Sequence, residues 1–216
     1  MTPDEPDISL SAMDGLRAAD IVDAMGRLHR HRCHILDLVS PTPDRILFGR
    51  AATISFAPSC AARLPVDRFN FTSALDKAVG ADGRGKVLVL ASNGYPDTSL
   101  GGGTKLSRLN QRGVAGLLAD GRLRDFDQLA QYSFTTRCRG ETTRWGGDDV
   151  TPFEAGIPVV FDRVLITPGD LIYADSSGTV VIPAEDSEAV AVLAGEIAEE
   201  EAKARSDIAD DERGRQ

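Results

Sequence analysis

Two short apolar segments, 87–91 and 114–120, restrict the fold more than any other feature of the sequence. Neither alternates between polar and apolar residues, which is typical of strands buried on both faces of a parallel sheet. A glycine-rich loop and a segment with helical periodicity lie between them. Residues 158–183 read as consecutive strands, with turns at 168–169 and 176–178. The sequence therefore predicts an α/β fold with a largely buried sheet and an antiparallel extension.

The chain of 216 residues is expected to form a single domain over residues 13–206. A chain of this length buries roughly 70% of its unfolded surface, so it needs no disulfide or structural metal to fold. Residues 1–12 and 207–216 lack apolar periodicity and are expected to be a flexible leader and a flexible tail. Asp14 is the expected N-cap of the first helix, and the last helix is expected to run from Asp186 to about Ser206.

Charge and cysteine content argue against several classes of protein. With 33 acidic and 24 basic residues the net charge is −9, which argues against binding to nucleic acid and to anionic membranes. The acidic N-terminus is unlike a signal peptide, and no apolar run reaches the ~18 residues of a membrane span. The three cysteines are widely spaced and form no Cys-x-x-Cys pair, as expected in the reducing cytoplasm.

The main candidate for a functional site joins a glycine-rich loop to an Arg-Asp pair. The loop residues that precede a predicted helix are Gly102, Gly103, Thr104 and Lys105. A helix N-terminus behind such a loop offers backbone N–H groups to a carboxylate or phosphate. Arg124 and Asp125 follow the strand at 114–120, where α/β sheets place their chemistry. Arg124 supplies a fixed positive charge, and Asp125 supplies an oxygen ligand for Mg²⁺ or Mn²⁺.

Each of these features also has an ordinary interpretation. The triple glycine could be a flexible turn, and the Arg-Asp pair could be a surface salt bridge or a helix N-cap. His29, His31 and His34 crowd together but alternate with arginines, which favours a basic helix end over a metal site. Trp145 is expected either to cap a pocket or to anchor a loop or an interface. No Ser-His-Asp set and no Gly-x-Ser-x-Gly elbow is visible.

Five stretches stand in a characteristic order along the chain: ADIVDAMGR (19–27), GRAATI (49–54), GKVLVLAS (85–92), GGTKLSRLNQRGVAGLLADGRLRD (102–125) and PGDLIYADSSGTVVIP (168–183). The pattern G-x-x-G-x-x-x-D-G-x-x-R-D is matched by Gly113, Gly116, Asp120, Gly121, Arg124 and Asp125. Together these stretches resemble the RraA-like family. That family includes the regulator of ribonuclease activity A and the class II 4-hydroxy-4-methyl-2-oxoglutarate aldolases.

The resemblance implies a single-domain αβ sandwich like the phosphohistidine swivelling domains. It also implies a homotrimer or dimer of trimers with sites between subunits. In the aldolases, the residue aligned with Asp125 holds Mg²⁺ or Mn²⁺, partly through waters, and the residue aligned with Arg124 stabilises the pyruvate enolate. Backbone amides of the loop at 102–105 hold the substrate carboxylate. A neighbouring subunit's C-terminal helix contributes a glutamate, for which Glu201 is the candidate.

Two positions depart from the aldolase pattern. It has an Asp twenty-one residues before the Arg and an acid three residues after the following Asp; here these positions hold Gly103 and Gln128. The loss of two negative charges is expected to weaken Mg²⁺ binding. Gln128 can still hydrogen-bond and orient a water molecule. Four acids nearby in the sequence are candidates to take over: Asp97, Asp120, Asp127 and Glu141.

These features predict a divalent-metal-dependent lyase that acts on a small 2-oxo acid or related carboxylate. The reaction would be retro-aldol cleavage or decarboxylation of an oxaloacetate-like substrate through an enolate. The missing acid at Gly103 leaves open a different reaction on the same scaffold, by a hydratase, dehydratase, isomerase or biosynthetic enzyme. A non-catalytic protein-binding regulator is the third alternative, since some RraA proteins bind and inhibit an RNA-processing endonuclease.

Overall fold

The computed structural model describes residues 10–29 and 31–214, which build one main sheet and five helices around it. Four parallel strands form the centre of this sheet: β2 (Leu47–Pro58), β3 (Lys86–Ala91), β5 (Gly116–Ala119) and β7 (Thr135–Cys138). The predicted segments 87–91 and 114–120 therefore become the neighbouring strands β3 and β5. Their leucines and valines are fully buried because the sheet is covered on both faces.

Antiparallel strands extend the sheet beyond β2. In spatial order these are β11 (Leu171–Ala174), β12 (Thr179–Ile182) and the short β1 (His34–Ile35). The C-terminal half of β2 also pairs with β8 (Val150–Ala155), so β2 joins the parallel and antiparallel parts. This arrangement confirms the predicted α/β fold with an antiparallel extension.

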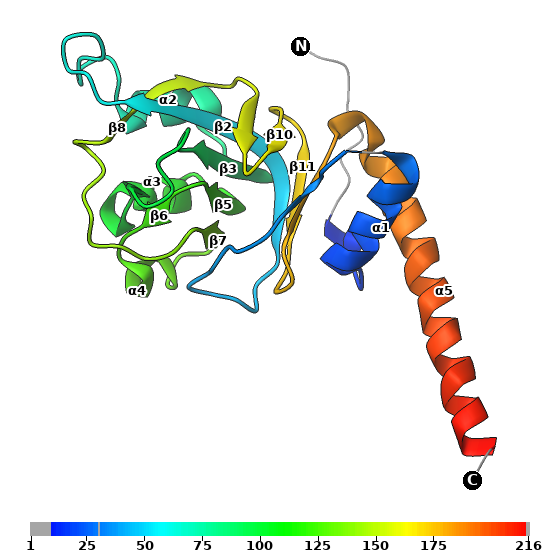
Figure 1. Cartoon of the computed structure of the whole chain (residues 1–216). Coiled ribbons are helices and arrows are strands. Elements are labelled where there is room, and N and C mark those ends of the chain that lie inside the picture. Colours follow the sequence, from blue (N-terminus) through cyan, green and yellow to red (C-terminus); the bar gives the residue numbers. More distant parts are fainter. Residues whose placement is uncertain (1–9, 30, 215–216) are drawn as a thin grey trace.

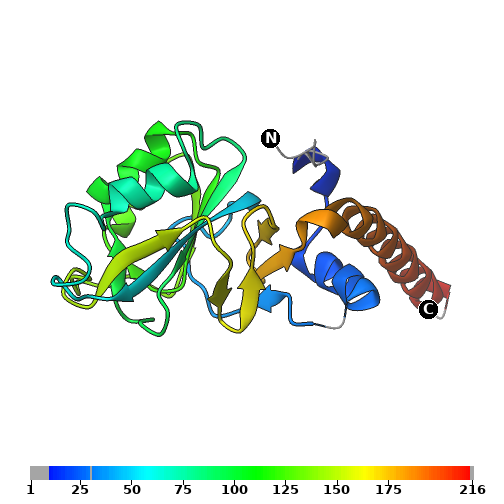
Figure 2. The same ribbon diagram turned by 90° about the horizontal axis from the view of Figure 1, so that it is seen from above.

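Different elements cover the two faces of the sheet. The helices α2 (Phe71–Ala78) and α3 (Gly103–Gln111) lie on one face (Figure 2), where Leu75 and Leu106 pack against the sheet. The hairpin of β9 (Val159–Phe161) and β10 (Val164–Ile166) covers part of the other face. The short helix α4 (Phe126–Leu129) stands beside α3 and follows the two-stranded pair of β4 (Ser99–Gly101) and β6 (Arg122–Leu123).

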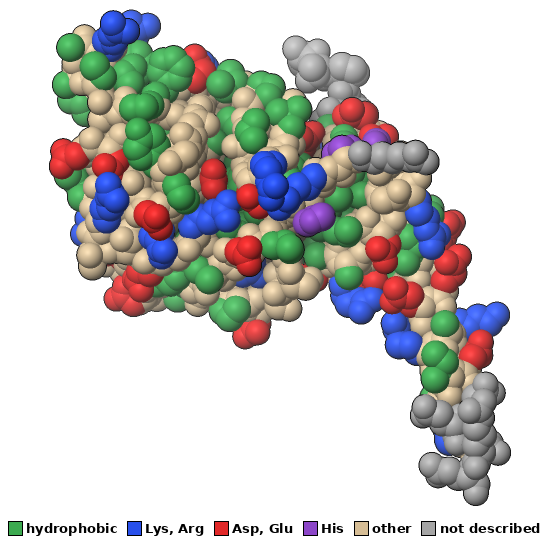
Figure 3. All heavy atoms as spheres, viewed as in Figure 1, with side chains coloured by type: hydrophobic (Ala, Val, Ile, Leu, Met, Phe, Trp, Pro, Cys, Tyr) green, Lys and Arg blue, Asp and Glu red, His purple; other side chains and the backbone are tan. Residues whose placement is uncertain are grey.

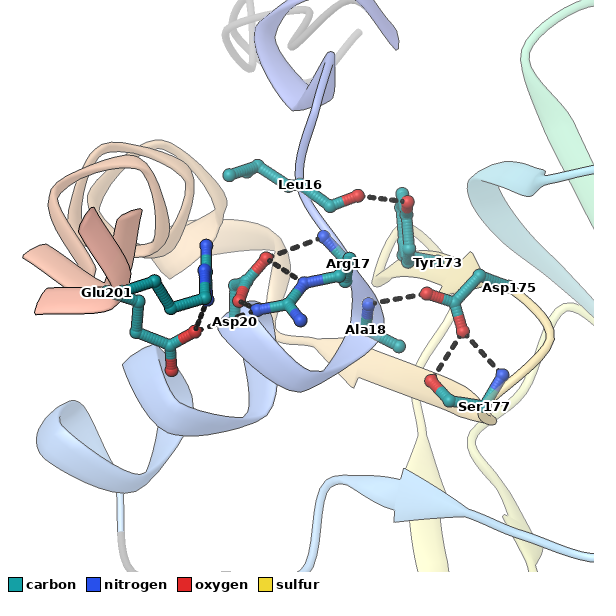
Figure 4. Close-up of polar contacts among 9 residues, drawn as sticks. Leu16, Arg17, Ala18, Asp20, Tyr173, Asp175, Ser177 and Glu201 are labelled. Carbon is teal, nitrogen blue, oxygen red and sulfur yellow. Dashed lines mark hydrogen bonds and ion pairs between the residues drawn. The ribbon is translucent and has the colours of Figure 1, made fainter. Parts of the chain in front are cut away.

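The helices α1 (Ala18–Leu28) and α5 (Ser187–Gly214) pack together at the β11–β12 end of the sheet (Figure 1), preceded by the 3₁₀ turns η1 (Leu10–Met13) and η2 (Ala184–Asp186). The expected N-cap Asp14 is wrong, because α1 begins later, behind Arg17. There the buried carboxylate of Asp20 accepts the backbone N–H of Arg17 at 2.8 Å. The Tyr173 hydroxyl donates to the Leu16 carbonyl at 2.7 Å (Figure 4), which ties α1 to the sheet.

The last helix extends further than the sequence predicts. It continues to Gly214 instead of ending near Ser206, and an ion pair of 3.2 Å between Arg213 and Asp210 bridges one turn of the additional segment. Most of the expected leader, residues 1–9, lies outside the described residues. No helix in the described part of the chain is long and apolar enough to cross a membrane.

Candidate functional site

The glycine-rich loop and the Arg-Asp pair meet because β4 and β6 run side by side in parallel. Ser99 pairs with Arg122 and Gly101 with Leu123, and the Arg124 N–H donates to the Gly101 carbonyl at 3.0 Å. The chain then leaves β4 into α3 and leaves β6 into α4. The predicted convergence of the loop at 102–105 with Arg124 and Asp125 is therefore present in the structure.

Close approach of side chains, rather than unusual backbone angles, favours glycine at the first two loop positions. A Cβ atom on Gly102 would lie 2.7 Å from the Asp125 carboxylate oxygen Oδ2. A Cβ atom on Gly103 would overlap Gln128 Oε1 and would lie 2.7 Å from its Cδ and 3.0 Å from its Cβ. The triple glycine is thus a packed junction between two helix starts, not a flexible turn.

Asp125 stands immediately before α4 in the left-handed backbone region, with φ of 62° and ψ of 51°. It makes no side-chain capping bond to α4. Its Oδ2 instead accepts the N–H of Gly103 at 2.8 Å, at the start of α3. The Asp125 carboxylate therefore already accepts the Gly103 N–H, which is one of the backbone groups predicted to bind an anion. Among the residues described, Thr104 and Lys105 N–H groups have no hydrogen-bond partner and remain free for an anionic ligand.

Two cationic side chains flank this junction. Arg124 is half-buried, and within residues 10–29 and 31–214 its guanidinium makes no hydrogen bond or ion pair. The surface salt bridge considered for Arg124 with Asp125 is therefore absent there. The Lys105 ammonium lies 5.4 Å from the centre of the Phe71 ring, a favourable position for a cation. Desolvation, together with the nearby charge of Arg108, lowers the pKa of Lys105.

Arg124, Asp125 and Lys105 line a cavity of about 690 Å³. Its floor includes residues 99–102 and 104–105, and its wall comes from the loop at 59–70, the start of α2 and residues 145–152. The predicted binding residue Gly103 does not line the cavity. Trp145 lines this cavity, in agreement with one of its two predicted roles. Sequence reasoning missed the loop at 59–70 as part of the site, because this loop reaches the site only through the pairing of β2 with β8.

The other predicted site residues lie elsewhere. Gln128 is exposed and covers Gly103 without lining the cavity. Glu201 lies on α5, where it accepts hydrogen bonds from Arg17 at 2.9 Å and Arg205 at 3.0 Å (Figure 4 shows Glu201 beside Arg17). Its suggested role in a neighbouring subunit stays a prediction.

The nearby acids do not replace the missing carboxylates of the family pattern. Asp97 accepts a hydrogen bond from Arg122 at 3.1 Å, and Asp120 accepts one from Arg139 at 3.1 Å. Glu141 accepts the Phe126 N–H at 2.9 Å. Asp127 is exposed on α4, and none of the four lines the cavity. Among the described residues no group of three or more His, Cys, Asp and Glu side chains is placed to hold a metal ion.

An α/β fold with a cavity where strand ends meet helix starts, lined by Arg124 and two free helix amides, defines the general class. The chain belongs to the Aldolase/RraA family of RraA-like proteins, whose model matches residues 18–181. A protein of Azotobacter vinelandii named "Putative 4-hydroxy-4-methyl-2-oxoglutarate aldolase" is 31% identical over 119 residues, which cover 53% of this chain and 70% of that protein.

Two solved structures have the same fold. Streptomyces coelicolor RraAS2, described as an unusual member of the RNase ES inhibitor RraA protein family, is 23% identical with a TM-score of 0.78; the match covers 91% of this chain and 96% of that chain. A protein of Pseudomonas syringae pv. tomato str. DC3000 is also 23% identical, with a TM-score of 0.75 over 94% of both chains. At this identity the likeness establishes the fold alone.

Proposed function

We propose that the protein is a lyase that cleaves a small 2-oxo acid at the cavity beside α3. The observation that carries this proposal is the half-buried Arg124, whose guanidinium has no partner among the described residues and which lines the same cavity as Thr104 and Lys105 with their free amides. A fixed cation next to helix N-terminal amides binds a carboxylate and stabilises a developing enolate oxygen. The name of the Azotobacter vinelandii relative supports the same reaction class.

The donor set fits Mg²⁺ or Mn²⁺ only as an ion held by one side chain. Asp125 Oδ2 is bonded to the Gly103 amide, which leaves Oδ1 as the carboxylate oxygen available to a cation. Mg²⁺ usually keeps several waters and takes one or two carboxylates together with substrate oxygens, so a single Asp ligand is acceptable. When bound there, the ion would polarise the 2-oxo group of the substrate. We expect weak metal binding in the absence of substrate.

The residues favour decarboxylation over retro-aldol cleavage. Retro-aldol cleavage requires a base that removes a hydroxyl proton, and Asp125 is the only carboxylate among the described residues that line the cavity. Decarboxylation of a 3-carboxy-2-oxo acid needs no such base: the C–C bond to the carboxylate breaks, CO₂ leaves, and the electron pair forms the enolate. Arg124 then stabilises the enolate oxygen, and a solvent proton completes the product.

The test compares oxaloacetate with 4-carboxy-4-hydroxy-2-oxoadipate as substrates in the presence of Mn²⁺. We expect turnover of oxaloacetate and a loss of about 10²–10³-fold in kcat/KM for Arg124→Met, the range found when one oxyanion donor is removed. The matched control is Arg122→Met, because Arg122 lies two residues away, bonds Asp97 and does not line the cavity. The proposal fails if neither acid is consumed and titration detects no Mn²⁺ binding. That result would favour another reaction on the scaffold or a protein-binding role.

A further inference from the structure

The cavity is larger and more apolar than a three- or four-carbon acid requires. Its volume of about 690 Å³ lies within the range of roughly 300–1,000 Å³ typical of sites for drug-sized molecules. Much of the cavity lining consists of apolar and aromatic side chains: Phe56, Leu64, Val66, Phe69, Phe71 and Trp145. Hydrophobic side chains gather at this corner of the molecule, over the loop before α2 and over β8 (Figure 3).

Contacts on both sides hold this wall in place. The Phe69 ring stacks on Phe153 of β8 with a centroid distance of 6.2 Å and an angle of 11° between the planes. The Ser59 N–H donates to the Asp149 carbonyl at 2.9 Å, and Asn70 caps α2 by accepting the Ser73 N–H at 3.0 Å. The loop at 59–70 is therefore attached at both ends, which makes the apolar wall a preformed part of the cavity.

Two large apolar side chains of the wall are strongly exposed to water. Val66 is 79% exposed and Trp145 is 64% exposed, although both line a concave site. Exposed apolar side chains grouped in a cavity mark a binding surface, because water leaves this surface favourably when a ligand covers it.

The cavity is lined by both charged and apolar groups. Arg124 and the free amides of Thr104 and Lys105 supply the groups that bind an anion, and the Lys105 ammonium over the Phe71 ring shows that charge and apolar surface adjoin. A ligand that uses both kinds of surface carries a carboxylate and a hydrocarbon group. We propose that the site takes a 2-oxo acid with an aliphatic or aromatic substituent, which lies between Val66 and Trp145. The carboxylate end of this inference rests on the proposed function.

Trp145 is the chain's single tryptophan, so its fluorescence reports directly on the proposed site. The experiment titrates the full chain with pyruvate and with 4-methyl-2-oxopentanoate, and isothermal calorimetry repeats both titrations. We expect 4-methyl-2-oxopentanoate to bind at least tenfold more tightly than pyruvate and to shift the Trp145 emission. Val66→Asp should remove that tenfold advantage, which is read as the ratio of the two affinities because the added negative charge weakens the binding of both acids. Val192→Asp is the matched control, because Val192 is 60% exposed on α5 and away from the cavity.

Equal affinities for the two acids, or no binding of either, overturn the inference. The same holds if Val66→Asp changes the mass of the protein in solution and not its affinity for the branched acid, because the wall would then be an interface between copies of this chain. The proposed function fails separately if 4-methylpentan-2-one, which lacks the carboxylate, binds as tightly as the acid and Arg124→Met has no effect. In that case the apolar wall still binds its ligand.

Discussion

The contact between Gly103 and Gln128 predicts that these two positions depend on each other. In Gly103→Ala the new methyl group would overlap Gln128 Oε1 and lie 2.7 Å from Cδ and 3.0 Å from Cβ. Without this contact, Gly→Ala in a helix stabilises by about 0.4–1 kcal/mol. Overpacking a core costs about 1–3 kcal/mol, but the Gln128 amide is the exposed end of a flexible side chain and moves aside more cheaply, so we expect a net loss of about 0.5–1 kcal/mol. For a chain of this size that corresponds to a decrease in Tm of about 1–4 °C.

A double-mutant cycle with Gln128→Ala isolates the contact. Gln128 is exposed, so Gln128→Ala alone should change stability by less than about 0.5 kcal/mol. In the Gln128→Ala background, the methyl group of Gly103→Ala no longer overlaps Oε1 and Cδ, and only its 3.0 Å contact with the Cβ of residue 128 remains. Gly103→Ala should then be nearly neutral, with a coupling energy of about 0.5–1 kcal/mol.

Urea denaturation of the four proteins gives the free energies of unfolding. Gly195→Ala is the matched control, because Gly195 lies inside α5 and a Cβ atom there meets nothing within 4 Å; this change should stabilise the protein. Effects of Gly103→Ala and Gln128→Ala that add within about 0.3 kcal/mol would refute the reasoning. If the coupling is present, an aldolase-type acid at position 103 has to displace the Gln128 amide.

Three further predictions concern residues outside this contact. Asp20→Ala removes the acceptor for the Arg17 N–H and should lower the free energy of unfolding by about 1–2 kcal/mol, whereas Asp20→Asn should lose less; equal losses would contradict a capping role. Cys60 is exposed, while burial raises the pKa of Cys138 to about 11, so Ellman's reagent should find one fast thiol, absent in Cys60→Ser. Desolvation raises the pKa of Asp120 above 3.8 despite Arg139. The stability that Asp120 contributes is therefore present in acid and is lost as pH rises through the pKa of the folded state. In unfolding curves measured over a series of pH values, Asp120→Asn should reduce the decrease in the free energy of unfolding with rising pH; an unchanged decrease would be incompatible with the raised pKa.

The parts of the fold that the sequence predicts correctly are those with a local signal. The strands β3 and β5 could be recognised because burial on both faces leaves no polar residue in residues 87–91 of β3 or in β5. The proximity of the loop at 102–105 to Arg124 could be predicted because the carboxyl ends of neighbouring parallel strands, and the helices that follow them, lie at the same edge of a sheet. The end of α5 was placed too early because apolar periodicity stops near Ser206, whereas charged pairs such as Asp210 and Arg213 continue the helix.

Features that depend on distant segments could not be predicted. The left-handed backbone of Asp125 and its bond to the Gly103 N–H follow from the packing of two helix starts. The apolar wall joins the loop at 59–70 to residues 145–152, which meet only because β2 pairs with β8. Asp14 is a good capping residue by type, but the carboxylate of Asp20 reaches the start of α1 from within the helix.

Strand β2 also determines when the main sheet can be completed during synthesis, because two of its partner strands come late in the chain. Its residues 47–50 pair with β11, which follows more than 120 residues later in the chain, and its residues 54–58 pair with β8. Until these partners emerge from the ribosome, both sections of that edge of β2 stay unpaired, and unpaired apolar edges promote aggregation. Because most pairings of β2 span long stretches of chain, folding is expected to be slow for a domain of this size. Fragments that end before residue 171 should accumulate in insoluble form.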